Sequence, residues 1–229
     1  MSGRVATFLV PIFLIVIISL TPVHAESTQP SIPINGRYSV LTIKIFIPVT
    51  PKWAHDVVLN AAVAWNRAQL LYLQNNPSAT VYTFAETDDG TATSTVSFSM
   101  PAAYAPIAVG WTNYKYAPGS RMAIVSTQTY LTPTVFNDAQ AGNATAKRYA
   151  FWLALHELGR ILGLGSLMDG RDIMEPRYFA NRVDAVPQFS TLDLYALHVL
   201  AQGNAPMFVT LPDGVQDQLM PVTTFLAAP

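Results

Sequence analysis

The chain of 229 residues contains no cysteine. It therefore cannot form a disulfide, and it has no thiolate with which to hold a metal ion. A metal site in this protein would have to be built from histidine, aspartate or glutamate side chains. Histidine is scarce as well, since the whole sequence contains only four.

Charge is the second shortage. Lysine, arginine, aspartate and glutamate make up 12% of the residues, about half the share of an average soluble domain, and the formal net charge is −1. The sequence has no basic stripe of the kind that nucleic acid or an anionic membrane surface requires, so we expect neither as a partner. Serine, threonine, tyrosine, glutamine and asparagine supply the polar surface instead, a composition compatible with export.

Long apolar runs are limited to one, at the N-terminus. The run ATFLVPIFLIVIISL at residues 6–20 follows Arg4, and two small residues, Val23 and Ala25, come after it. This pattern predicts a secretory signal peptide over residues 1–25, because the run is shorter than the ~20 residues that a membrane-spanning helix needs. We therefore expect a secreted or cell-surface protein without membrane contact after cleavage. An uncleaved N-terminal anchor is the alternative.

Residue patterns in the remaining chain predict one α+β domain. Apolar positions in residues 52–74 recur at helical spacing without glycine or proline. Residues 37–48 have the period of two that is typical of a strand, with one face formed by Leu41, Ile43, Ile45 and Ile47. Further strands are expected over residues 80–84, 94–100, 107–114 and 120–131, a loop over residues 132–145 and a second long helix from about Ala146. This order indicates a twisted sheet packed under a helix.

The second helix carries the stretch LALHELGRILGLGSLMDGRDIMEP, residues 153–176. On a helix, two histidines four residues apart can direct both imidazoles at one metal ion, and a glutamate directly after the first faces the metal-bound water. His156 and Glu157 match the first half of this pattern, but Arg160 occupies the position of the second histidine. A guanidinium has no lone pair to donate, and its positive charge repels a divalent cation.

Glycines after this helix allow the chain to turn back. Gly163 and Gly165 supply the break after which a third histidine is expected to complete such a metal site. Ser166 stands at that position instead, and a neutral hydroxyl is a poor zinc ligand. The sequence thus offers one imidazole where a zinc site of this kind needs three.

The segment HELGRILGLGS, together with IMEP downstream, resembles the metzincins and within them the matrixin branch of zinc endopeptidases. The family pattern is H-E-x-x-H-x-x-G-x-x-H followed by a methionine turn. The resemblance implies that His156 is a zinc ligand, Glu157 the catalytic glutamate and Met174 the turn methionine. Arg160 and Ser166 then occupy degenerate ligand positions.

The resemblance extends over residues 37–202 and implies the family fold. That fold is a twisted, mostly parallel sheet with an antiparallel edge strand, two long helices, a methionine turn and a C-terminal helix. Residues 26–36 would form a short N-terminal segment, and residues 203–229 would form a C-terminal extension.

The family fold also implies a place for substrate. An extended substrate lies along the edge strand and adds to it by backbone hydrogen bonds. The corresponding substrate edge strand in this chain contains Ile107, Val109 and Trp111, and no charged residue interrupts residues 107–114. An uncharged edge of this kind is usually blocked or covered unless it binds something.

Three functions stay open on the sequence. We expect an exported, catalytically degenerate member of this metallopeptidase family, with zinc absent or weakly bound, that retains binding of an extended peptide or protein segment. The first alternative is an active zinc endopeptidase in which His156 acts together with Asp169, Asp172 or His198. The second is a structural cell-surface domain.

Overall fold

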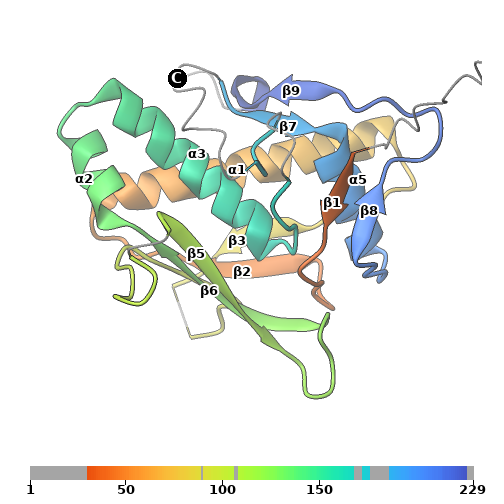
Figure 1. The fold of residues 1–229 in the computed structure, drawn as a ribbon, viewed down its shortest axis with the longest axis horizontal. Coiled ribbons are helices and arrows are strands. Elements are labelled where there is room, and N and C mark those ends of the chain that lie inside the picture. Colours follow the sequence, from red (N-terminus) through yellow and green to blue (C-terminus); the bar gives the residue numbers. More distant parts are fainter. Residues whose placement is uncertain (1–29, 89, 106–107, 168–171, 176–185, 226–229) are drawn as a thin grey trace, which may run out of the picture.

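The computed structural model describes residues 30–88, 90–105, 108–167, 172–175 and 186–225. The expected signal peptide over residues 1–25 lies outside them. The described part of the chain forms an α+β fold with a mixed, mostly parallel sheet of five strands and four α-helices (Figure 1). The predicted α+β class with a mostly parallel sheet and an antiparallel edge strand is therefore confirmed. No helix within these ranges combines enough length and apolar character to cross a membrane.

The central sheet has one antiparallel strand, at its edge. Its strands are β2 (Thr42–Phe46), β3 (Thr83–Glu86), β4 (Ser94–Ser97), β5 (Gly110–Tyr116) and β6 (Ile124–Leu131). Strand β2 pairs in parallel with β3 and β4, and β4 pairs in parallel with β6. Strand β5 pairs in antiparallel with β6, so the order is β3-β2-β4-β6-β5. One side of β5 is thus the edge of this sheet.

The two long helices lie on one side of the sheet (Figure 1). The helices are α1 (Lys52–Asn75), α2 (Pro133–Gln140), α3 (Ala144–Ile161) and α5 (Thr191–Ala201). Helices α1 and α3 contact each other, and α3 contacts β5 and β6. On β2 and just after it, Ile43, Ile45 and Ile47 are buried, as their period of two predicts. Leu41 precedes the strand and is exposed instead.

The predicted loop over residues 132–145 is wrong, because most of it is helix α2. Pro133 stands in the first turn, where a helix does not use the missing N–H, so this proline starts the helix and does not break it. The ring of Phe136 is buried and packs edge-on against Trp53 and Phe98. This aromatic contact is made across the fold and cannot be read from the local pattern.

The predicted strands are present with different ends. Ranges 37–48, 80–84, 94–100, 107–114 and 120–131 correspond to β2, β3, β4, β5 and β6. A strand ends where its neighbour stops pairing, whereas the apolar alternation continues wherever side chains still meet the core. The alternation therefore locates each strand but not its last residue.

Two small antiparallel pairs involve the segments that were expected to flank the domain. Strand β1 (Ser31–Pro33) pairs with β8 (Phe208–Thr210), and β7 (Gln188–Ser190) pairs with β9 (Leu219–Pro221), which precedes the 3₁₀ helix η1 (Val222–Phe225). Ile32 and Val209 are buried in the core from the first of these pairs. Residues 31–33 and 208–210 thus pack with the rest of the fold.

Trp65 of α1 contacts both α3 and strand β7. Its side chain is fully buried, and its indole N–H donates to the Leu155 carbonyl over 2.9 Å. The ring of Phe189 in β7 lies edge-on to it at 4.6 Å between centroids. Three elements distant in sequence therefore meet at this one side chain.

Replacing Trp65 by alanine is expected to lower the free energy of unfolding by about 3–5 kcal/mol, because the loss of so large a buried ring leaves a cavity. Leu70 lies on the exposed side of the same helix, so Leu70→Ala is the control and should change stability by less than about 0.5 kcal/mol. Urea unfolding followed by circular dichroism measures both variants. Equal losses in the two would contradict this account of the core.

Candidate functional site

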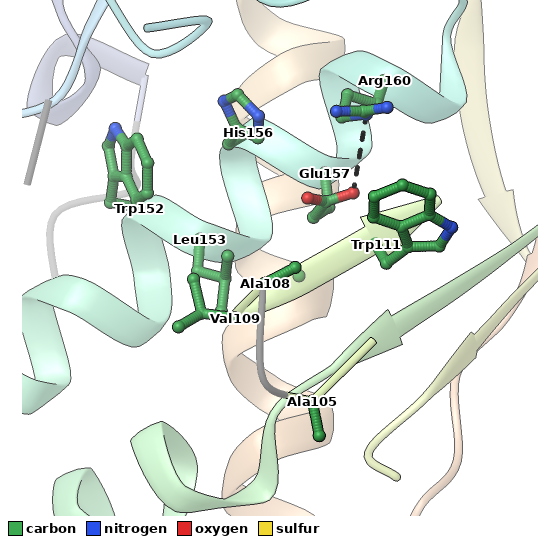
Figure 2. A pocket seen from close by; sticks show the side chains of 10 residues that line it. Ala105, Ala108, Val109, Trp111, Trp152, Leu153, His156, Glu157 and Arg160 are labelled. Atoms are coloured by element: carbon green, nitrogen blue, oxygen red, sulfur yellow. Dashed lines mark ion pairs between the residues drawn. The ribbon is translucent and has the colours of Figure 1, made fainter. Parts of the chain in front are cut away.

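A cavity of about 500 Å³ lies between the start of β5 and helix α3 (Figure 2). It brings together five residues that the sequence singled out. His156, Glu157 and Arg160 line it from the helix, and Val109 and Trp111 line it from the strand side. The remaining lining residues are Ala105, Ala108, Gly110, Trp152 and Leu153.

Helix α3 presents these side chains because of their spacing. Asn143 caps its N-terminus, accepting a hydrogen bond from the Ala146 N–H. Trp152, His156 and Arg160 follow one another at intervals of four residues, so they lie along one face of the helix. The rings of Trp152 and His156 stack with centroids 5.3 Å apart and 27° between their planes. The cavity is thus lined by a continuous stripe of aromatic and charged groups.

His156 is buried as a neutral imidazole. Its Nδ1 lies 2.8 Å from the Ile173 carbonyl, and since a carbonyl can only accept, Nδ1 carries the proton. Burial is the main cause that lowers the pKa of His156, although the neighbouring Glu157 acts in the opposite direction. At neutral pH the Nε2 atom therefore keeps a free lone pair as a hydrogen-bond acceptor.

Glu157 is also buried, and a hydroxyl from the edge strand satisfies it. The Thr112 hydroxyl donates to its Oε2 over 2.6 Å, and the Thr129 hydroxyl lies 2.9 Å from that of Thr112. Because Thr112 has one proton and gives it to the carboxylate, Thr129 donates to Thr112. A Cβ added to Gly110 would lie 2.7 Å from the Glu157 Oε1, so a larger residue would force the Glu157 or Leu153 side chain to move.

Arg160 is held beside this carboxylate. Its Nε lies 3.9 Å from the Glu157 Oε2, which is an ion pair without a hydrogen bond. Its Nη1 makes a long contact of 3.5 Å to the Ser166 hydroxyl. Burial opposes the charged guanidinium, but Glu157 and Tyr114 outweigh it and raise the pKa of Arg160. Arg160 is therefore positively charged at neutral pH.

After α3 the chain comes back to this helix at residues 172–175, where the Ile173 carbonyl meets His156. The helix ends at Ile161, and Gly163 takes a φ of +102°, which favours glycine. Met174 is fully buried in this turn, and a Cβ added to Gly159 would lie 2.5 Å from its sulfur. Asp172 stabilises the turn, since its Oδ1 accepts the Met174 N–H over 2.8 Å.

The residues present do not fit the zinc ion that the metzincin resemblance implies. His156 offers one nitrogen, Arg160 has no lone pair, and the Ser166 hydroxyl accepts from that guanidinium. Among the described residues, no group of three or more histidine, aspartate or glutamate side chains could hold a metal ion. The donor chemistry around His156 therefore does not support a zinc site.

The other proposed ligands are engaged elsewhere or lie outside the described ranges. His198 of α5 contacts the backbone of Thr80 through its Nδ1, at 3.0 Å from the N and 3.2 Å from the O. His55, the remaining histidine of the described residues, has its Nε2 2.6 Å from a Glu86 oxygen. Neither histidine lines the cavity, and Asp169 belongs to the residues that the structure does not describe.

The register of β5 shows which backbone groups face its open edge. Among the expected edge residues, Ile107 lies outside the described residues, and Val109 precedes β5. The Val109 carbonyl accepts from the Thr132 N–H, so residue 109 faces β6, and the alternation of antiparallel pairing places Trp111 likewise. The groups that point to the open edge are those of Gly110, Thr112 and Tyr114. No strand among the described residues pairs with them.

Sequence reasoning missed three contributors to the site: Gly110, Thr112 and Trp152. A signal existed for Trp152, which lies four residues before His156 on a predicted helix and so belongs to the same face. Thr112 alternates with Trp111 and must point to the other face of the strand, but which face meets α3 follows only from packing. No local sequence pattern indicates that the backbone at Gly110 lies close to the side chain of Glu157.

Comparison with known proteins supplies no family. No protein-family model and no curated protein matches this chain. The metzincin resemblance therefore rests on the motif residues themselves.

Replacing Thr112 by valine is expected to lower the free energy of unfolding by about 1–3 kcal/mol, because the buried Glu157 carboxylate loses its donor while side-chain shape is kept. Thr95 in β4 is only partly buried and serves as the matched control. Thr95→Val should have an effect below about 0.5 kcal/mol. Thermal and urea unfolding of the two variants measure the difference, and equal effects would mean that Glu157 does not depend on Thr112.

Proposed function

We propose that this chain is an exported domain on a metzincin-like scaffold that binds extended peptide segments between β5 and α3 without hydrolysing them. The observation that carries the proposal is the position of Arg160, whose guanidinium lies 3.9 Å from Glu157 and lines the same cavity. A fixed positive charge takes the place that the family pattern gives to a zinc ligand. The open edge of β5 runs beside it.

The surroundings of Glu157 argue against a hydrolytic role. A general base must accept a proton from an activated water molecule. The Oε2 atom of Glu157 already accepts a hydrogen bond from the Thr112 hydroxyl, and the Arg160 guanidinium lies 3.9 Å from the same oxygen. A guanidinium that stays protonated cannot bind water as a metal ion does and lower its pKa. The ion pair of Glu157 and Arg160 therefore favours binding of a ligand over catalysis.

The edge of β5 supports the binding part of the proposal. Extended peptides add to exposed strands through backbone hydrogen bonds, and side-chain pockets beside the strand give specificity. The outward backbone groups of Gly110, Thr112 and Tyr114 follow the open edge. Gly110 also lines the 500 Å³ cavity, which supplies such a pocket. A purely structural domain would gain by blocking this edge with charge or proline, and the one charged residue in β5 is Lys115.

Zinc content tests the non-hydrolytic part. We expect the purified protein to hold clearly less than one equivalent of zinc after exposure to the ion. The double variant Arg160→His with Ser166→His should take up about one equivalent, because it offers three imidazoles. Elemental analysis measures both, with Arg160→His alone as the control for a single added imidazole.

Two results would count against this expectation. A tightly bound equivalent of zinc in the unaltered protein, together with chelator-sensitive proteolysis, would restore the active endopeptidase. A folded double variant without zinc would mean that positions 160 and 166 do not correspond to metal ligands.

Backbone methylation tests the peptide-binding part. The best binder from an unbiased library of octapeptides is resynthesised with one N-methyl group at each position in turn. A peptide that adds to β5 should lose affinity at every second position, by roughly three- to tenfold, because each lost hydrogen bond contributes about 0.5–1.5 kcal/mol. Fluorescence anisotropy measures the series, and the unaffected alternate positions are the internal control. A uniform effect, or no binder at all, would favour the structural alternative.

A further inference from the structure

The charges that face the cavity balance each other. Glu157 contributes one negative charge, Arg160 one positive charge, and His156 is neutral. Among the described residues, no other lining residue is ionisable, since the rest are alanine, valine, glycine, leucine and tryptophan. A ligand group that enters the cavity therefore meets both signs of charge at one polar end.

Within the described part of the chain, this polar end has unused hydrogen-bonding capacity of both kinds. The Arg160 Nε has no hydrogen-bond partner among the described residues, and the contact from its Nη1 to Ser166 is long at 3.5 Å. The Tyr114 hydroxyl lies nearby, but it donates to the Arg160 backbone carbonyl over 2.9 Å. On the acceptor side, Thr112 occupies the Oε2 of Glu157 and leaves Oε1, and His156 keeps its Nε2 lone pair. Donor and acceptors lie within two turns of one helix.

The walls beside this end are apolar. Trp152 and Leu153 from α3 and Val109 ahead of β5 line the cavity together with two alanines. In Figure 2 the aliphatic side chains gather below His156, while Glu157 and Arg160 lie together at the other end. An aliphatic stem with a polar tip fits this division.

The chemistry of the tip follows by comparing the possible groups. A carboxylate would bind Arg160 but be repelled by Glu157, and an ammonium would have the opposite conflict. A hydrocarbon would displace the water around both charged side chains and could not replace the hydrogen bonds that this water makes. A carboxamide offers one acceptor and two donors without net charge, so its oxygen can accept from Arg160 while its NH₂ group donates to Glu157 or His156.

We infer that the cavity is a pocket for an uncharged carboxamide, namely the side chain of an asparagine or glutamine in the bound segment. The inference rests on the proposed peptide binding and adds its specificity. It predicts that the opposite charges of Glu157 and Arg160 together select an uncharged ligand. Removing one of the two charges should make the pocket prefer an ion of the opposite sign to the charge that remains.

Small fragments test the pocket without a peptide. Propionamide, propionate and propylammonium have similar size and differ in charge. Titrations into ¹⁵N-labelled protein are followed through the indole N–H signals of Trp111 and Trp152. Propionamide should bind about tenfold more tightly than either ion, which corresponds to roughly 1.4 kcal/mol. Equal binding of the three, or tighter binding of an ion, would overturn the inference.

Charge removal sharpens the test. Arg160→Met leaves Glu157 alone and should move the preference to propylammonium, whereas Glu157→Gln leaves Arg160 alone and should move it to propionate. Arg121→Met, in the exposed loop before β6, is the matched control and should keep the preference for propionamide. If both cavity variants fold and keep the wild-type order, the two charges do not set selectivity and the inference fails.

Peptides separate this inference from the proposed function. The octapeptide binder is varied at one position at a time among glutamine, glutamate, lysine and methionine. One position at which glutamine is preferred by about tenfold would support the pocket. Peptides that bind without such a preference would refute the carboxamide pocket and leave peptide binding standing. Selective binding of propionamide without any peptide binder would support the pocket and refute peptide binding.

Discussion

The buried carboxylate of Glu157 is the constraint on which the arrangement of α3 and β5 depends. An ionised carboxylate in the interior is costly unless hydrogen bonds and an opposite charge replace its water. Thr112 supplies the hydrogen bond, Thr129 supports Thr112, and Arg160 supplies the charge. Gly110 has no side chain, so the strand can lie this close to Glu157. Helix and edge strand are therefore held in one relative position by a buried polar contact.

The same contact sets the chemical character of the cavity. A divalent metal ion beside a glutamate would make bound water acidic, whereas a guanidinium offers only fixed donors and a permanent single charge. On the proposed function, Arg160 turns a place suited to activating water into one suited to holding a ligand group. The neutral His156 adds an acceptor and no charge to that place.

His156 has a structural task that does not involve a metal. Its Nδ1–H donates to the Ile173 carbonyl, which ties helix α3 to the turn that buries Met174. Its ring also stacks on Trp152 one turn earlier. A histidine at this position thus stabilises the fold even where no zinc is bound. Its presence alone is no sign of a metalloenzyme.

The sequence by itself determined that α1 and α3 are helices and that β2 to β6 are strands, and it determined which residues share one face of α3. Periods of two and 3.6 located β2 and α1, and the spacing of His156, Glu157 and Arg160 placed them together on α3 because a helix defines its own faces. The chemistry of Arg160 could also be argued beforehand, since no environment gives a guanidinium a lone pair. These conclusions depend only on local geometry and on the side chains themselves.

Tertiary structure decided what depends on partners distant in sequence. Helix α2 forms around Phe136, whose ring packs on Trp53 and Phe98, so its local proline misled the prediction. Which backbone groups of β5 face outward follows from its register with β6, because a shift of one residue would reverse every position. The donor to Glu157 likewise comes from Thr112, 45 residues away. Periodicity tells which residues share a face, but only packing tells what that face meets.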